Sequence, residues 1–176
     1  VWTTTGGALD ITAGTVSGLA GAQLVVSGAT LAFSPATLTV PLTLTTTTIV
    51  GGAVTIASGQ TLTLLGGGLS DPVSVQSGGV LLIRGAAALS GALTLPTGAM
   101  LRVLGDNTVG TAALSVASGF TNSGTIELTN SGGGSAASLT VSSGTLTNAP
   151  GGLINSIAST GGNRTLAAQL DNQGTL

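Results

Sequence analysis

A short alternating pattern that ends in glycine recurs along this chain. Each copy reads apolar, polar, apolar, any residue, Ser or Thr, and then Gly; the copies are VTIASG (54–59), VSVQSG (73–78), LTLPTG (93–98), LSVASG (114–119) and LTVSSG (139–144). The period is roughly 20 residues and lengthens towards the last copy. Alternation with period two predicts a half-buried strand, and Ser-Gly predicts a turn. A repeat of this period restricts the chain to repeat architectures.

A second short strand is predicted after each of the first four glycines. These strands are TLTLL (61–65), VLLI (80–83), MLRV (100–103) and TIEL (125–128). No stretch of ten or more residues has helical apolar spacing without an intervening glycine. A repeat of two or three strands without a helix cannot bury its apolar face alone, whereas stacked copies can. We therefore predict an all-β fold, a parallel β-helix (β-solenoid) with roughly 20 residues per rung and about eight rungs.

Stacking the second strands in parallel predicts which side chains share a column. One column of inward residues contains Leu62, Leu81, Leu101 and Ile126, and the next contains Leu64, Ile83, Val103 and Leu128. The outward column between them contains Thr63, Leu82, Arg102 and Glu127. Because Arg102 and Glu127 fall on consecutive rungs, we predict a structural ion pair between them. An exposed pair of this kind contributes about 0–1 kcal/mol.

The whole chain, residues 1–176, is predicted to be a single solenoid segment. Residues 54–176 form the regular rungs and residues 1–53 the less regular ones, in which LDITAG (9–14), LVVSG (24–28) and LTVPL (38–42) resemble earlier copies with spacings nearer 14 to 16. The sequence starts with Val and shows no charged segment followed by an apolar one. We expect it to be part of a longer chain.

Asparagine recurs at Asn122, Asn148 and Asn172, in FTNSGTI, LTNAPGGLI and LDNQGTL. Both steps are close to the one from Gly119 to Gly144, so the three side chains are expected at one corner of successive rungs. Asn tolerates the left-handed backbone conformation that such corners use. Two interpretations stay open: a ladder of stacked amides, or ordinary turn residues.

The residue types that carry out chemistry are scarce. Charged residues make up 5% of the chain, and His, Cys, Lys and Tyr are absent. General acid–base work needs His or converging carboxylates, and the acids Asp10, Asp71, Asp106 and Asp171 are scattered at expected corners. We therefore predict no catalytic residue, no cofactor and no metal site; GGGLSD (66–71) is a single loose match to a calcium repeat. No basic patch exists for nucleic acid, a small-molecule ligand is not expected, and no apolar run of about 18 residues predicts a transmembrane segment.

FTNSGTIELTN (120–130), LTNAPGGLIN (146–155) and the Ser/Thr-Gly after each alternating strand resemble the degenerate repeats of bacterial surface β-helix proteins. The relatives meant are filamentous-haemagglutinin-like adhesins and autotransporter passengers. The likeness covers roughly residues 54–176. It implies export to the cell surface or the medium, a β-helical shaft, and a role in attachment or scaffolding, and it brings no catalytic residue.

Composition and repeat together favour a structural role. Sheet edges are normally guarded by residues such as Lys, so a chain without Lys is expected to self-associate into an oligomer or filament. A binding face is the alternative, either an adhesin surface or an ice-binding surface built on outward Thr rows; the candidates are Thr37, Thr39, Thr43, Thr45, Thr55, Thr61 and Thr63. A polysaccharide-degrading β-helix is a third hypothesis, which the scattered carboxylates disfavour.

Overall fold

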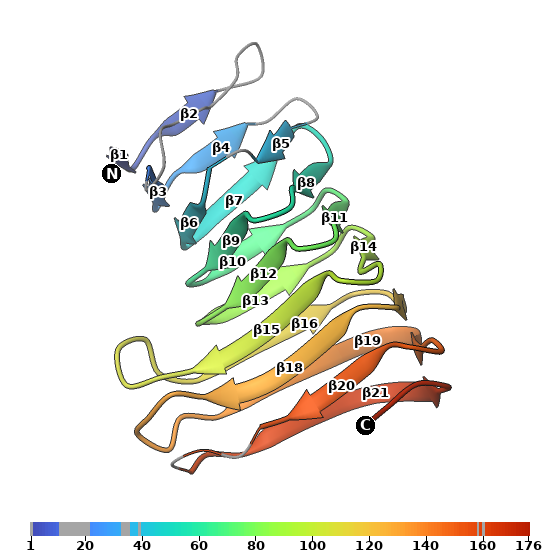
Figure 1. The fold of residues 1–176 in the computed structure, drawn as a ribbon. Helices are drawn as coiled ribbons and strands as arrows, with labels where there is room; N and C mark the ends of the chain where they lie inside the picture. The colour runs from blue at the N-terminus through green and yellow to red at the C-terminus, as the bar shows by residue number, and fades with distance from the viewer. Residues whose placement is uncertain (1, 11–21, 33–35, 39, 158, 160) are drawn as a thin grey trace.

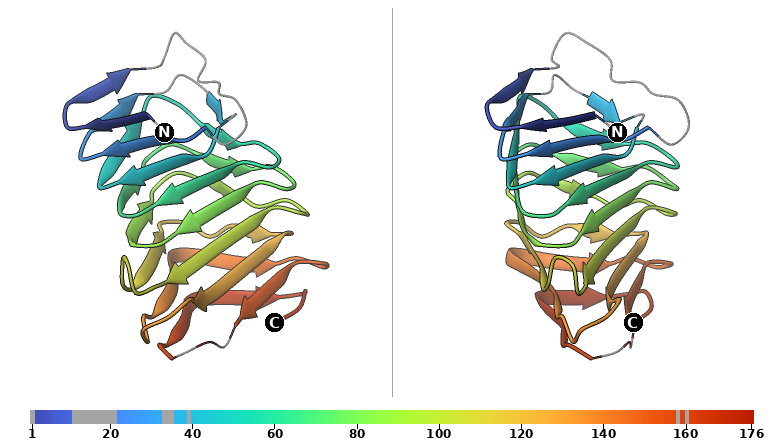
Figure 2. Two further views of the ribbon diagram at one scale, coloured as in Figure 1. Left: turned by 60° about the vertical axis from the view of Figure 1, so that its left-hand side comes forward. Right: turned by 90° about the vertical axis from the view of Figure 1, so that its left-hand side faces the viewer.

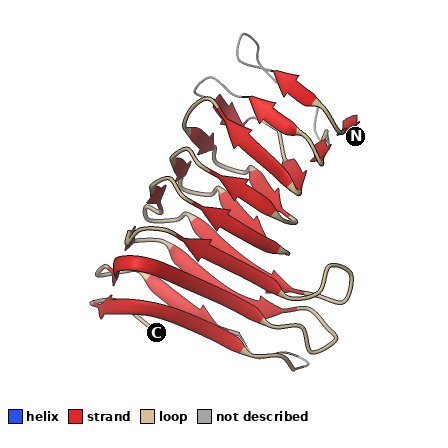
Figure 3. Cartoon of the chain, turned by 180° about the vertical axis from the view of Figure 1, so that it is seen from behind, coloured by secondary structure: helices blue, strands red, loops and turns tan. Residues whose placement is uncertain are grey.

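The chain winds into a stack of parallel strands (Figure 1). This computed structural model describes residues 2–10, 22–32, 36–38, 40–157, 159 and 161–176. Strands and connecting loops account for all of the described residues, and Figure 3 shows them from behind. The described part contains no helix that is long and apolar enough to cross a membrane. The fold is a parallel β-solenoid, as the repeat predicts.

Sheet A forms one side of the solenoid and contains 8 strands in parallel pairs. In stacking order they are β1 (Trp2–Thr5), β3 (Leu24–Ser27), β6 (Leu42–Thr45), β9 (Thr61–Leu64), β12 (Val80–Ile83), β15 (Met100–Gly105), β18 (Thr125–Asn130) and β20 (Leu153–Ser156). One register column passes through all of them and contains Trp2, Leu24, Leu42, Leu62, Leu81, Leu101, Ile126 and Ile154. Eight strands therefore enclose seven turns, about 22 residues apart.

Sheets B and C form the other two sides. Sheet B contains β2 (Ala8–Asp10), β4 (Thr30–Ala32), β7 (Thr47–Val50), β10 (Gly67–Leu69), β13 (Ala86–Leu89), β16 (Ala112–Val116), β19 (Ala137–Asn148) and β21 (Arg164–Asn172). Sheet C contains β5 (Ala36–Leu38), β8 (Val54–Ile56), β11 (Val73–Val75) and β14 (Leu93–Thr94). From β3 to β14 each rung runs through the sheets in the order A, B, C, and Figure 2 shows the strands stacked along the solenoid axis.

Sheets B and C merge towards the C-terminus. The short strand β17 (Thr121–Asn122) continues the stack of sheet C, because Asn122 bridges to Leu95 just after β14. β17 then pairs with the second half of β19, whose first half pairs with β16. β21 follows β19 along both halves, with a register shift between Thr140 and Thr145. One long, bent strand therefore replaces two separate strands in the last two rungs.

The core is a set of apolar columns that run along the solenoid. Leu62, Leu81, Leu101 and Ile126 are register partners on successive strands, and each is 0% exposed. Leu64, Ile83, Val103 and Leu128 form the neighbouring column and are buried as well. Both predicted columns are confirmed. Alternation places these residues inside because successive strand residues point to opposite faces of the sheet.

The corner between sheets C and A is built from stacked glycines. The N–H of Gly59 donates to the carbonyl of Gly78 (3.0 Å), and the N–H of Gly78 donates to that of Gly98 (2.8 Å). All three have positive φ, 73°, 80° and 81°, a conformation that costs little only for glycine. A Cβ on Gly78 would also lie 2.7 Å from the Ser58 hydroxyl oxygen. The Ser/Thr-Gly of the repeat is thus the close contact between adjacent corners.

Aligning all five repeat copies on their glycines is wrong beyond residue 98. The first three copies lie in sheet C, in β8, β11 and β14, whereas LSVASG and LTVSSG lie in sheet B, in β16 and β19. Gly144 accordingly stacks next to Gly119 at the corner after sheet B, not above Gly98. The local pattern is the same on both sides of the solenoid because a half-buried strand followed by a turn looks alike wherever it lies.

The same ambiguity affects the expected repeat copies in the first third. Leu9 pairs with Leu31 in sheet B, while LVVSG begins in sheet A, where Leu24 pairs with Trp2. LTVPL joins the end of β5 to the start of β6. The first two turns therefore run from Trp2 to Leu24 and from Leu24 to Leu42, and both are longer than the expected spacing. Residues 11–14 of LDITAG lie outside the described residues.

Candidate functional site

The three predicted asparagines lie in one column at the end of the last rungs. The side-chain amide of Asn122 donates to Asn148 Oδ1 (2.8 Å), and that of Asn148 donates to Asn172 Oδ1 (2.7 Å). The amides of Asn122 and Asn148 each donate as well to a backbone carbonyl further along the coil, Leu153 O for Asn122 (3.2 Å) and Thr175 O for Asn148 (3.1 Å). Of the two interpretations left open by the sequence, the structure has the ladder.

The backbone of this ladder differs from the one expected. Thr46 is the only residue other than glycine with positive φ in the part of the chain that the structure describes, so none of the three asparagines is left-handed. Asn122 and Asn148 are instead strand residues whose side chains point inward, and both are 0% exposed. Buried amides must have partners, and stacking identical amides supplies them; Asn172, in the last rung, is exposed.

Arg102 and Glu127 are adjacent on β15 and β18, as the predicted outward column requires. Arg102 Nε lies 2.6 Å from Glu127 Oε1, and Arg102 Nη2 donates to Glu127 Oε2 (3.2 Å). The Nε contact is ionic rather than a directed hydrogen bond. The side chains are 39% and 10% exposed. Glu127 is therefore more enclosed than an outward position suggests, because its carboxylate lies against the guanidinium of the preceding rung.

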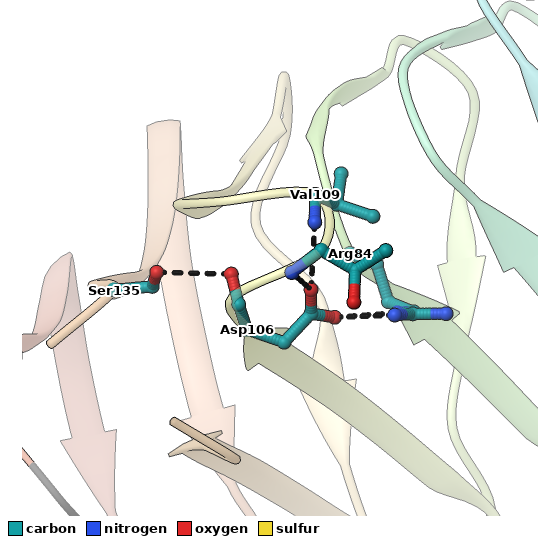
Figure 4. A network of polar contacts seen from close by, with 5 residues as sticks. Arg84, Asp106, Val109 and Ser135 are labelled. Carbon is teal, nitrogen blue, oxygen red and sulfur yellow. Dashed lines mark hydrogen bonds and ion pairs between the residues drawn. The ribbon is translucent and has the colours of Figure 1, made fainter. Parts of the chain in front are cut away.

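A second ion pair, which the sequence interpretation missed, lies where sheet A turns into sheet B (Figure 4). Arg84 Nη2 lies 2.6 Å from Asp106 Oδ2, and Arg84 Nε donates to the same oxygen (2.7 Å). The other carboxylate oxygen, Oδ1, accepts from the backbone N–H groups of Thr108 (2.8 Å) and Val109 (2.7 Å). The Ser135 hydroxyl donates to the carbonyl of Asp106 (3.0 Å) and connects this loop to the loop of the next rung.

Asp106 is 4% exposed, and its environment favours the ionised form. Burial by itself raises the pKa of a carboxyl group. Here the hydrogen bonds from Val109, Arg84 and Thr108, together with the Arg84 charge, outweigh burial and hold the pKa of Asp106 below its ordinary value of 3.8. The carboxylate thus acts as an acceptor that closes its own loop and joins it to β12.

Arg164 and Asn130 form a third polar group at the same corner, one rung further on. Arg164 Nη2 donates to Asn130 Oδ1 (3.1 Å), and Arg164 Nη1 donates to the carbonyls of Gly161 (2.9 Å) and Gly162 (2.5 Å). The Asn130 amide donates to the carbonyls of Ser135 and Gly161. The contacts Arg84–Asp106, Ser135–Asp106 and Arg164–Asn130 each join residues of different rungs, so no local sequence pattern indicates them.

Four of the threonines proposed for a binding face lie in two rows, whereas Thr45 pairs with Ser27 and Thr61 pairs with Val80 in other columns of sheet A. Thr43 and Thr63 are register partners on sheet A, where Leu82 and Arg102 continue the column. On sheet C the row is longer, because Thr37, Thr55, Ser74 and Thr94 are successive partners. Thr39 lies outside the described residues. Sheet C therefore carries an outward hydroxyl on each of four rungs.

Metal ligands do not gather anywhere in the described ranges: no group of three or more His, Cys, Asp or Glu side chains could hold an ion there. The middle of GGGLSD, residues 67–69, forms strand β10 of sheet B. Comparison with family models, curated proteins and solved structures found no match for this chain. The contacts of the polar groups themselves are therefore the basis for a functional proposal.

Proposed function

We propose that this chain is a segment of a structural β-solenoid on or outside a bacterial cell, serving as a shaft or as a self-associating subunit of a fibre or surface layer. The observation that carries the proposal is the direction of the polar contacts. Arg102–Glu127, Arg84–Asp106 and the asparagine ladder each join one rung to the next. An enzyme needs its charged groups to converge on a substrate, whereas these groups hold the coil together along its axis.

The two ends of the described stack support association end to end. At one end the inward side chains of β21, Leu166, Ala168 and Leu170, are packed on the core but only partly buried; at the other end Leu9 and Ala22 are in the same condition. A solenoid rung buries its apolar face only when another rung covers it. Each end can therefore accept a further rung, from the remainder of a longer chain or from another copy stacked head to tail.

Electron microscopy of the purified protein over a range of concentrations tests this proposal. We expect elongated particles that join along their long axis into filaments as the concentration rises. Single, unassembled particles at every concentration would contradict the self-associating role. The flanking sequence in the parent gene is an independent check, since a secretion signal, a membrane anchor or further repeats are expected beside a surface shaft.

A face that orders water is the second candidate, and the hydroxyl row of sheet C favours it. Thr37, Thr55, Ser74 and Thr94 repeat at the strand spacing of about 4.8 Å. A regular hydroxyl array of this kind can hold water in fixed positions. Thermal hysteresis in a freezing assay, lost in Thr55→Leu, is expected if the row binds ice. Unshaped ice crystals in the presence of the protein would reject this candidate.

A further inference from the structure

We propose that the outer face of sheet A pairs two copies of this chain side by side, by a two-fold axis that places Arg102 of each copy over the partner's Glu127. This lateral surface is distinct from the ends discussed above, and pairing through it does not require end-to-end stacking. The proposal rests on three features of the face: its apolar character, its contrast with sheet B, and the arrangement of its two charges.

The outward side chains of the middle strands of sheet A are mostly large and apolar. On β12 they are Val80 and Leu82, and on β15 they are Met100 and Leu104 beside Arg102. All are half-buried, as are Leu65 just after β9 and Leu153 on β20. The strand sequences are therefore continuous apolar runs: VLLI in β12, and MLRVL in β15, which only Arg102 interrupts. Such runs are typical of parallel strands that are covered on both faces.

Sheet B lacks this character, although it belongs to the same rungs. From β10 to the first half of β19 its outward residues are small; they are Gly68, Ala86, Ala88, Ala113, Ser115, Ser138 and Thr140. On β7 the outward Val50 is the exception, with 38% of it exposed. Both sheets stack the same number of turns, so the solenoid itself does not require large apolar residues on its outside. The bulky residues on sheet A therefore have a separate cause, and an apolar covering is the simplest one.

Arg102 and Glu127 determine how a second copy can cover the outer face of sheet A. They are neighbours in one column, on consecutive strands. If a second copy were related by an axis along the solenoid, each rung would face its own copy, and Arg102 would face the partner's Arg102. An axis along the strands, midway between β15 and β18, exchanges these two levels instead. Arg102, whose side chain is 39% exposed, then faces the partner's Glu127 twice, once in each direction. The Glu127 side chain is 10% exposed and already binds its own Arg102, so the partner's guanidinium adds to an existing pair and like charges do not meet.

The same axis also brings together residues of suitable size. Val80, Met100, Thr125 and Leu153 form one column in register. The two-fold axis passes through the middle of this column. Rotation about it places Val80 opposite the partner's Leu153 and Met100 opposite the partner's Thr125. In the column of the charges Leu82 faces the partner's Asn155, and in the next column Leu104 faces the partner's Thr129, which is 8% exposed. The four strands around the axis thus combine complementary charges with one apolar pair and three contacts between an apolar and a polar side chain, which commits the proposal to a second copy of this chain as the occupant.

Light scattering and small-angle X-ray scattering of the whole protein test the pairing. We expect a dimer of about twice the width and the same length as one copy. Met100→Asp buries an unpaired charge in the interface and is expected to raise the dimer dissociation constant by roughly tenfold or more. Thr48→Asp adds the same charge to the exposed face of sheet B and should leave it unchanged. Circular dichroism checks that both variants remain folded.

Cross-linking tests the symmetry, since the chain has no cysteine of its own. In a mixture of Val80→Cys and Leu153→Cys copies, the facing thiols are separated by the sheet spacing of about 10 Å. In Val80→Cys alone, the two thiols are three strand levels further apart, about 14 Å along the axis. A short bis-maleimide should therefore link the mixture and not the single variant. Monomers only, dimers of doubled length, equal cross-linking in both samples, or binding to lipid vesicles without pairing would each overturn the proposal.

Discussion

The solenoid has two regions that are held together differently. Between residues 22 and 104 the turns are short and pass through three separate strands; the sheet A column advances from Leu24 through Leu42, Leu62 and Leu81 to Leu101. From residue 105 onwards the turns are longer, since the next members are Ile126 and Ile154, and from β19 onwards two of the sides merge into one long strand. Seven polar or charged residues of the described chain are buried, and all but Thr47 belong to the second region.

The difference shows what a longer rung requires. A short rung leaves little backbone uncovered at its corners, so apolar columns and close glycine contacts suffice. A longer rung has extra loop residues, and their backbone groups need partners. Asp106, Asn130 and Asn148 provide these partners from inside the fold. The second region is therefore expected to depend on polar contacts that the first does not need.

The largest effect is expected in the apolar columns. Leu81→Ala removes a fully buried side chain and should lower the free energy of unfolding by about 2–5 kcal/mol. Leu82→Ala changes the same residue type one position along, on the outer face, and should cost less than about 1 kcal/mol. Urea denaturation of both variants measures the two values. Equal losses would mean that the inward and outward assignment of β12 is wrong.

The asparagine ladder should show the next largest effect. Asn148→Ala leaves the buried amide of Asn122 without its side-chain acceptor, at a cost of about 1–3 kcal/mol. Asn172→Ala removes the exposed last member of the ladder and should cost less, since water can replace it. Chemical denaturation of the pair separates a ladder from ordinary turn residues. If both variants match the wild type, the second region does not depend on its stacked amides.

The stacked glycines at the corner between sheets C and A stabilise the first region, and substituting them should have a smaller effect than the changes above. Gly59→Ala and Gly78→Ala both impose positive φ on alanine, which costs about 1–2 kcal/mol. Only the Cβ at position 78 meets another atom, the Ser58 hydroxyl, so Gly78→Ala should be the less stable variant. Adding Ser58→Ala should remove that excess. Thermal melts of the three variants show whether the loss of stability on replacing glycine comes from the contact with Ser58 or from the backbone conformation alone.

A pH dependence is the smallest expected effect and belongs to the second region. The pKa of Asp106 is lower in the folded chain than its ordinary value of 3.8, so the ionised carboxylate stabilises the fold above that pH. This contribution is lost as the pH falls through the folded pKa. Asp106→Asn should therefore be less stable than the wild type at neutral pH. The gap should narrow below about pH 3.8 in melts followed by circular dichroism; a constant gap would refute the role of the charge.

Residues with a strong local pattern were predictable from the sequence, and those fixed by loop geometry were not. Leu62, Leu81 and Leu101 follow from alternation and period, and the adjacency of Arg102 and Glu127 follows from the same register. The pattern alone could not tell sheet B from sheet C, which misplaced LSVASG and LTVSSG. One signal was present: TLTLL begins almost directly after Gly59, whereas FTNSG lies between Gly119 and TIEL and leaves room for a further short strand.

The added residues of the long turns enter largely at one place, the corner between sheets A and B. β12 and β13 are joined there by residues 84–85 alone, while β15 and β16 are joined by residues 106–111, and β18 and β19 by residues 131–136 (Figure 1). Strand pairing continues unbroken on both sides of these loops. The number of stacked turns and the length of the corner loops can consequently change independently in this architecture. A foreign peptide inserted in one of these loops, with the backbone contacts to Asp106 kept, should be displayed at the rim without disturbing the turns above and below.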